Sequence, residues 1–286
     1  MKADLHVHTN QSDGSFSSKE VVDLAISRGV NILAITDHDT VSGIQSALNS
    51  SYNKNIKVIP GIEISASVGD SDDEIHIVGL NIDFKNSKIE ALSNSALEFK
   101  HLKTKKRLEL INARFGSNIT YDEIKAKTLG EPGGPHIAMV LLEKHYILDI
   151  KEGILLMTKG GPCEVHLEKK PIQAKEAIEI IHNSGGIAIL AHLSAYKNLK
   201  KFVTFEEQEN LVKQLKAQGL DGIEIYIPEA SEEDIKFGNK LAETYKLLVS
   251  GGSDFHDEKF IPLSKLGFLE VNSAKLTVIN KFLNIQ

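Results

Sequence analysis

Short apolar runs alternate with amphipathic stretches over the first eighty or so residues of the chain. Apolar or alternating runs predict strands over residues 3–8, 31–36, 56–65 and 74–82. Helix-start residues at Ser17-Ser18 and at Thr40-Val41-Ser42 each precede an amphipathic helix, and Gly29 ends the first one. Strands that alternate with helices indicate a mainly parallel sheet.

The pattern becomes helical near residue 85. A long helix is predicted over residues 89–115, and shorter helices over 121–127 and 136–147, with a Gly/Pro-rich break, LGEPGGP, between the two shorter ones. The alternation then resumes, with helices predicted over 174–186, 205–219 and 231–245 and strands over 187–192, 222–227 and 247–256. We therefore expect one α/β domain, residues 1–84 and 172–286, that carries a helical insertion, residues 85–171.

Composition narrows the class of protein. The net charge of −6 argues against a surface that holds long nucleic acid, but it allows a small anionic substrate if bound metals dominate the local field. Cys163 is the one cysteine, which excludes an intramolecular disulfide and a thiolate metal cage. Because no apolar run approaches the roughly 18 residues of a membrane span, we expect a soluble, cytoplasmic protein that binds no membrane.

Ionisable residues gather within, or just past the ends of, the predicted strands. Glu63 and Asp254 lie there, and so do six of the 11 histidines: His6, His8, His38, His76, His192 and His256. Residues two apart in a strand point to the same side, so His6 and His8 can serve one metal. A single strand histidine is ordinarily a hydrogen-bonded packing residue. Burying this many ionisable groups without a counter-ion would cost on the order of several kcal/mol each, so the joint pattern indicates a metal site.

A family resemblance follows from these motifs. The segments HVHTNQSDGS, ITDHDT, GIEIS, HIVGL, ILAH and GGSDFH stand in the order found in the polymerase-and-histidinol-phosphatase (PHP) superfamily. The stretches over 133–147 and 177–193 resemble the branch that includes phosphatases of nucleoside 3′,5′-bisphosphates and a 5′→3′ exoribonuclease. The resemblance implies a distorted (β/α)7 barrel, a TIM-like α/β fold, with two to three divalent metals.

The resemblance also implies which residues hold each metal when three are bound. The first metal takes His6, His8, Glu63 and Asp254. Glu63 bridges to the second, which also takes His76 and His192, and the third takes Asp13, His38 and His256. Six imidazoles and three carboxylates favour Mn²⁺, Zn²⁺ or Fe²⁺ over Mg²⁺. Asp37, beside His38, is a candidate for an outer carboxylate that orients an imidazole.

Basic residues of the insertion are candidates for substrate contacts. Lys100, Lys103 and Arg107 fall on one face at helical spacing, which is ordinarily a solvated face. By resemblance this face grips substrate phosphate, with Arg107 the leading candidate, Lys103 beside it, and His136 turned toward the substrate. The chain departs from the family pattern at Gly134, where relatives commonly have Arg. It departs again at Leu193, where Pro often follows the Ala-His pair.

The predicted reaction is hydrolysis of a phosphomonoester of a small nucleotide, a 3′,5′-bisphosphonucleoside or a nucleoside monophosphate. A metal-bridged hydroxide would attack phosphorus, and the catalytic set is Glu63, His192, Asp254 and His256. Three alternatives stay open: a 5′→3′ exoribonuclease on short RNA, a histidinol phosphatase and a non-catalytic metal-binding scaffold. The absence of Trp and an aromatic content of 6% disfavour the exonuclease, which needs bases to stack along a track. The oligomeric state is left open.

Overall fold

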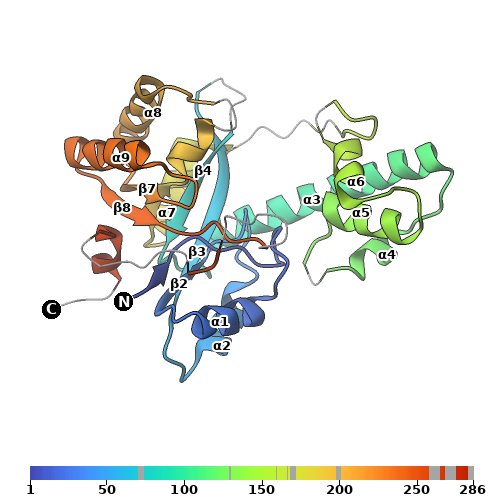
Figure 1. Ribbon diagram of the computed structural model, residues 1–286, viewed down its shortest axis with the longest axis horizontal. Coiled ribbons are helices and arrows are strands. Elements are labelled where there is room, and N and C mark those ends of the chain that lie inside the picture. The colour runs from blue at the N-terminus through green and yellow to red at the C-terminus, as the bar shows by residue number, and fades with distance from the viewer. Residues whose placement is uncertain are drawn as a thin grey trace.

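Eight strands form one curled sheet in the computed structural model, which describes residues 1–69, 74–128, 130–158, 160–165, 167, 172–197, 201–257, 265–267 and 275–282 (Figure 1). The strands are β1 (Ala3–Asp4), β2 (Ile32–Ile35), β3 (Lys57–Ser67), β4 (Glu74–Leu80), β5 (Ile172–Gln173), β6 (Ile187–Leu190), β7 (Gly222–Tyr226) and β8 (Leu248–Gly251). Their order is β1-β2-β3-β4-β6-β7-β8, and β5 pairs with the end of β3.

The sheet is a curled half-barrel within a mixed α/β fold. Neighbouring strands are parallel except at β4, which runs antiparallel to both β3 and β6, so the expectation of a mainly parallel sheet is right apart from this strand. The segments that follow the first and last strands, β1 and β8, meet at a parallel bridge between Val7 and Phe255.

The reversed direction of β4 decides where its histidine lies. His76 stands opposite Ser65, near the carboxyl end of β3, and the next residue, Ile77, stands opposite Leu190 at the end of β6. The start of β4 therefore lies at the edge of the sheet where the parallel strands end. His76 joins the other strand-end residues because its own strand runs backwards.

Helices pack around the sheet. They are α1 (Ser18–Ser27), α2 (Ile44–Ser51), α7 (Ala174–Asn183), α8 (Phe205–Ala217) and α9 (Glu232–Tyr245), with 3-10 turns at Leu193–Lys197 and Thr277–Lys281. Ser17 and Glu20 form a capping box at α1, as the sequence predicts for this start. The second helix begins later than predicted, at Ile44, because the Thr40 hydroxyl bonds Ser42 in a turn. Within the described ranges, no helix is both long and apolar enough to cross a bilayer.

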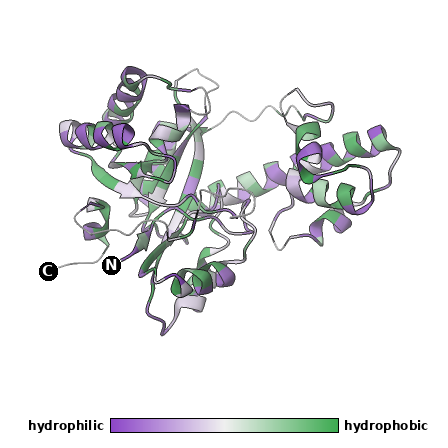
Figure 2. Ribbon diagram, in the orientation of Figure 1, coloured by the Kyte–Doolittle hydropathy of each residue, from purple (hydrophilic) through white to green (hydrophobic). Residues whose placement is uncertain are grey.

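The predicted insertion is a helical cluster that stands away from the sheet on the long helix α3 (Figure 1). It comprises α3 (Ser87–Phe115), α4 (Tyr121–Lys125), α5 (Gly134–Glu143) and α6 (Ile150–Met157). Figure 2 shows apolar faces turned toward the interior of this cluster, where Leu108, Ile111, Ile137, Leu141 and Met157 form a hydrophobic core separate from those of the sheet.

Helix α6 was not predicted from the sequence. Gly153 lies inside this helix, and glycine inside a helix costs about 1 kcal/mol relative to alanine, which lowers the local helical signal. In the structure a Cβ on Gly153 would lie 2.6 Å from the Ala138 Cβ of α5. The glycine is therefore what lets α5 and α6 pack closely, and tertiary packing outweighs the weak local propensity.

We predict that Gly252→Ala destabilises the fold where the last and first strands meet. An added Cβ would lie 2.4 Å from the His6 Cβ and 2.5 Å from the His6 backbone nitrogen, so the two segments must separate. We expect a loss of about 1–3 kcal/mol in the free energy of unfolding, measured by denaturant titration of chelator-treated protein. Gly134→Ala, whose Cβ would meet its nearest atom at 3.5 Å, is the control. Equal stability of the two variants would contradict the packing argument.

Candidate metal centre

The structure brings all nine predicted metal ligands to one edge of the sheet. The loop after β1 carries His6, His8 and Asp13, and His38 follows β2. Strands β3 and β4 carry Glu63 and His76, His192 follows β6, and Asp254 and His256 follow β8. The donor atoms of eight of them form three groups that could each hold a cation: His6, His8, Glu63 and Asp254; His38, Glu63 and His76; and His8, Asp13, His38 and His256. His192 belongs to none of these three groups, although its Nε2 atom is 3.1 Å from Oε1 of Glu63.

Glu63 lies at the centre of these groups and is fully buried. Its Oε2 atom is 3.2 Å from Nε2 of both His6 and His8 and 3.1 Å from Nδ1 of His38. Its Oε1 atom faces the other way, 3.0 Å from Nδ1 of His76 and 3.1 Å from Nε2 of His192. The two oxygens of one carboxylate thus serve two separate sets of imidazoles.

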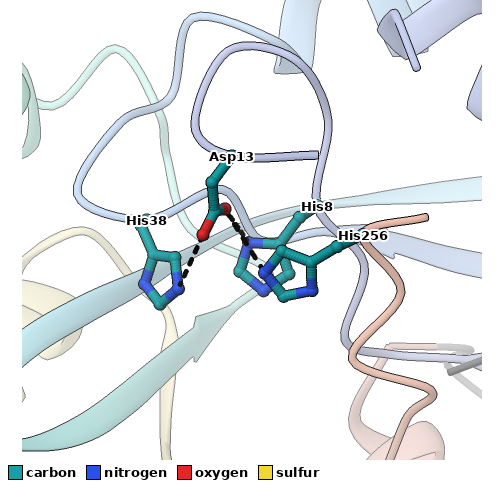
Figure 3. Close-up of side chains that lie close together, drawn as sticks. All are labelled: His8, Asp13, His38 and His256. Carbon is teal, nitrogen blue, oxygen red and sulfur yellow. Dashed lines mark ion pairs between the residues drawn. The ribbon is translucent and has the colours of Figure 1, made fainter. Parts of the chain in front are cut away.

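The Asp13 carboxylate also lies among three imidazoles, on the side of the site that faces the cavity (Figure 3). Its Oδ1 atom is 3.3 Å from Nε2 of His256 and 3.6 Å from Nδ1 of His8, and its Oδ2 atom is 3.9 Å from Nε2 of His38. The rings of His8 and His256 stack with their centroids 4.0 Å apart. Three imidazoles therefore surround one carboxylate at the mouth of the site.

The unpartnered donor atoms and the distances between them are those expected around a bound cation. Several buried ligand atoms have no hydrogen-bond partner in the described part of the chain: Nε2 of His6, Nε2 of His8, Nδ1 of His38 and Oε2 of Glu63. Native folds rarely leave buried polar atoms in that state. Atoms that share a cation at about 2.1 Å lie about 3 Å from each other, which is the spacing around Glu63.

The charges of the cluster are balanced by protons when no cation is bound. Burial opposes the charged form of His8, yet the neighbouring carboxylates of Asp254 and Glu63 raise its pKa to about 10. Burial also opposes charge on His76, and Glu63 and Glu74 raise its pKa to about 10. Burial lowers the pKa of His38 to about 4 despite the carboxylates beside it. A cation that binds here must therefore displace protons from imidazoles.

Asp37 supports the site in a different way from the one predicted. This buried carboxylate accepts hydrogen bonds from the Thr9 backbone N–H, the Thr9 hydroxyl and the Ser12 hydroxyl, each at 2.7 Å. Those contacts fix the loop that carries Asp13. The nearest link to an imidazole is indirect, through the Ser12 hydroxyl 3.5 Å from Nδ1 of His8.

Three supporting residues were missed at the sequence level. Asp4 accepts hydrogen bonds from the backbone N–H groups of Ser253 and Gly267, so it holds the turn before Asp254; burial raises its pKa to about 6. The Tyr196 hydroxyl accepts the backbone N–H of His76. Glu224 accepts from His6 and from the backbone of His192. The available signal was a carboxylate within an apolar strand, DLHVH for Asp4 and GIEIYI for Glu224.

A cavity of about 670 Å³ leads from the candidate metal ligands to the helices α3 to α6. It is lined on one side by Asp13, His38 and His256, and on the other by the predicted substrate residues Lys103, Arg107 and His136, together with Lys100. The Lys100 Nζ atom donates to the backbone oxygen of Ser12 at 2.8 Å, next to Asp13. The insertion therefore forms the second wall of the cavity.

We predict that metal binding releases protons and weakens as the pH falls. The raised pKa values of His8 and His76 mean that both imidazoles are charged at pH 7.5 in the metal-free protein, and only neutral imidazoles bind metal. Apparent Mn²⁺ affinity should drop about tenfold per pH unit for each proton displaced. Calorimetry in two buffers of different ionisation enthalpy measures the release. Identical heats would contradict the prediction, and His182→Gln, which alters a histidine paired with Asp221, is the control.

Several known proteins of similar sequence are named as enzymes that act on phosphate esters. The chain is 35% identical over 258 residues to the 5′-3′ exoribonuclease of Haemophilus influenzae, covering 89% of this chain and 90% of the relative. It is 30% identical over 278 residues to the phosphoribosyl 1,2-cyclic phosphate 1,2-diphosphodiesterase of Eggerthella lenta, covering 94% and 98%. It is 28% identical over 263 residues to the 3′,5′-nucleoside bisphosphate phosphatase of Chromobacterium violaceum, covering 88% and 86%.

A solved structure and a family model agree with these relatives. The crystal structure of a protein described as a metal-dependent phosphoesterase from Bifidobacterium adolescentis matches the fold with a TM-score of 0.78 and 24% identity, covering 98% of this chain and 95% of that one. The model of the PHP domain family matches residues 4–224, which include seven of the nine candidate ligands. The chain therefore belongs to the PHP domain family.

Proposed function

We propose that the protein is a metal-dependent phosphoesterase that hydrolyses a phosphomonoester of a small nucleotide, a 3′,5′-bisphosphonucleoside or a nucleoside monophosphate. The observation that carries this proposal is the cavity that joins the ligand cluster to a basic wall on the insertion. Such a cavity can hold a phosphate at one end and the remainder of a small anionic molecule at the other.

Two to three divalent cations would occupy the cluster, with the nine ligands divided among them as the resemblance implies. Their imidazole and carboxylate donors favour Mn²⁺, Zn²⁺ or Fe²⁺. Cations held there would neutralise phosphate charge and make water a competent nucleophile near neutral pH. Glu63 would hold two of them at a fixed spacing, since its two oxygens face separate imidazole groups.

The other three proposed catalytic residues occupy different positions around the Glu63 carboxylate. His192 contacts Oε1 of Glu63 on the inner side, while the Asp254 carboxylate lies 3.1 Å from Nε2 of His8. His256 lines the cavity as well as the cluster, so it is placed to face the phosphate. Together these residues orient the reacting group relative to the ligands and restrict its approach to the cavity side.

Arg107 is the proposed contact for a second anionic group. Its Nη2 atom donates to the Met157 backbone oxygen at 3.3 Å, while its Nε atom is buried with no partner among the described residues. A phosphate oxygen would satisfy that donor. A Cβ on Gly134 would lie 3.5 Å from Nη1 of Arg107. Arg107 on α3 thus reaches the place beside position 134 where relatives commonly have Arg.

His136 would contribute a neutral hydrogen bond to the substrate. Its Nδ1 atom accepts the Gly133 backbone N–H at 3.0 Å, so the proton of the neutral ring is on Nε2. Burial, followed by the nearby charges of Lys100 and Lys125, lowers the pKa of His136 to about 4. Lys103 adds positive charge to the same wall, and Leu97, Met139 and Ile154 give the cavity an apolar surface against which a base can pack.

Short RNA is the second candidate substrate, favoured by the relative named as a 5′-3′ exoribonuclease at 35% identity. A hydrolysis screen of Mn²⁺-loaded protein separates the candidates. It compares adenosine 3′,5′-bisphosphate, adenosine monophosphate, histidinol phosphate, a ribose 1,2-cyclic phosphate and a short 5′-phosphorylated RNA. Fastest turnover of either adenosine phosphate supports the first candidate, fastest turnover of the RNA supports the second, and no hydrolysis of any compound contradicts both.

The domain division and the barrel belong to the same proposal. We propose an α/β domain of residues 1–84 and 172–286 with a helical insertion of residues 85–171, supported by the separate hydrophobic core of α3 to α6. We also propose that the sheet is a distorted (β/α)7 barrel, supported by the bridge between Val7 and Phe255 that joins its two ends.

Glu63→Gln should abolish most of the activity without unfolding the protein. The amide keeps the shape of the side chain but removes the charge that faces two imidazole groups. We expect turnover of the best substrate in the screen to fall at least about a hundredfold, with an unchanged circular dichroism spectrum. Turnover close to that of the unaltered protein would remove Glu63 from its bridging role.

Arg107→Ala should weaken kcat/KM for adenosine 3′,5′-bisphosphate by about tenfold or more and leave p-nitrophenyl phosphate hydrolysis nearly unchanged. The reason is that the aryl phosphate has no second anionic group to contact the guanidinium. Lys106→Ala, which alters an exposed residue of the same helix, is the control and should change neither value. If both substrates respond equally to Arg107→Ala, the arginine does not recognise a second phosphate.

A further inference from the structure

Glu224 is a buried carboxylate that directly contacts two candidate ligands without being one of them. It lies in the middle of β7 and is 2% exposed. One oxygen, Oε2, accepts a hydrogen bond from Nδ1 of His6 at 3.0 Å and another from the backbone N–H of His192 at 2.8 Å. No lysine or arginine among the described residues forms an ion pair with it, so its surroundings there provide hydrogen bonds rather than a permanent counter-charge.

The contact with His6 determines which ring nitrogen can bind a cation. A carboxylate accepts hydrogen bonds, so the proton of the neutral ring is on Nδ1 and the lone pair is on Nε2. That Nε2 atom is buried without a hydrogen-bond partner in the described part of the chain and lies 3.2 Å from Oε2 of Glu63. Glu224 therefore selects the tautomer, fixes the ring plane and makes Nε2 a stronger donor.

The contact with His192 holds a backbone conformation that a side chain disfavours. His192 has a φ of +32°, in the left-handed region, which costs a residue other than glycine on the order of 1 kcal/mol. In this conformation its Nε2 atom lies 3.1 Å from both Oε1 of Glu63 and Nδ1 of His76. Losing the acceptor would leave a buried N–H unpaired and remove the contact that holds this turn.

We propose that Glu224 is a positioning residue that aligns the ligands of two neighbouring cation sites through a single oxygen atom. His6 contacts one oxygen of Glu63 and His192 contacts the other, so Glu224 acts on both sides of the bridging carboxylate. The inference rests on the proposed metal-dependent function, but it concerns cation binding and not the identity of the substrate. It adds to Asp37 and Asp4, which hold loops and do not contact an imidazole.

The test compares Mn²⁺ binding to chelator-treated protein carrying Glu224→Ala or Glu224→Gln. The alanine variant loses both contacts, and we expect Mn²⁺ affinity to fall about tenfold to a hundredfold at more than one site. Glutamine keeps an oxygen that can accept both hydrogen bonds, so its affinity should lie closer to that of the unaltered protein. Glu243→Gln, which alters an exposed carboxylate of α9, is the control and should bind Mn²⁺ normally.

A second readout separates positioning from folding. The visible absorption of bound Co²⁺ reports the geometry of its ligands, so it should change in Glu224→Ala and be largely restored in Glu224→Gln. A merely structural role would lower the denaturation midpoint of the metal-free protein and leave both the Mn²⁺ affinity and the Co²⁺ spectrum of the folded protein unchanged. If the alanine variant does not fold, Glu224→Asp takes its place, because its shorter side chain cannot reach both partners.

The outcomes also separate this inference from the proposed function. Mn²⁺ affinity within about twofold of normal in the folded alanine or aspartate variant overturns the role of Glu224, whatever the enzyme hydrolyses. Weakened binding in that variant together with recovery in the glutamine variant supports it, even if the unaltered protein hydrolyses none of the phosphate esters. In that case the proposed activity fails while the positioning role stands.

Discussion

The architecture depends on one electrostatic constraint, the burial of the Glu63 carboxylate among imidazoles. A buried carboxylate without compensating charge would cost several kcal/mol or would be neutralised by a proton. Here the charges of the surrounding histidines hold the pKa of Glu63 well below its usual range even though burial acts in the opposite direction. The compensating groups come from the segments after β1, β2 and β6 and from the start of β4, which supply His6, His38, His192 and His76.

Much of the site could be predicted because its residues are ionisable side chains that stand out among the apolar residues of the strands. An ionisable residue within an apolar strand, such as Glu63, or just past one, such as His38, adds nothing to an apolar core, so it indicates a chemical role. The strand order and the direction of β4 could not be predicted, since both depend on pairings between distant segments. His76 was nevertheless placed correctly among the strand-end residues, because reversing β4 brings its first residues to the same edge. Which ligand serves which cation stays a prediction.

The supporting residues were harder to predict than the ligands. Glu224 and Asp4 each stand once in an apolar strand, and nothing local distinguishes a carboxylate that orients a ligand from one that holds a loop. Asp37 illustrates the ambiguity, since its sequence neighbour His38 is a candidate ligand but its hydrogen bonds are with Thr9 and Ser12. Helix α6 was missed for a related reason, because the contact between Gly153 and Ala138 exists only in the folded protein.

Because α3 is long and uninterrupted, a small tilt at its first turn would change the width of the cavity. At 1.5 Å per residue, its 29 residues span about 43 Å, with one end beside the sheet and the other within the insertion. Near its start, the Asn86 side chain donates to the Asn183 backbone oxygen and the Asp83 N–H donates to that of Ser184, both at the end of α7. A tilt of about 5° at this fulcrum would move the far end by about 4 Å. A small change in the polar contacts between the first turn of α3 and the end of α7 would therefore produce a large change in the distance between the candidate ligands and the insertion.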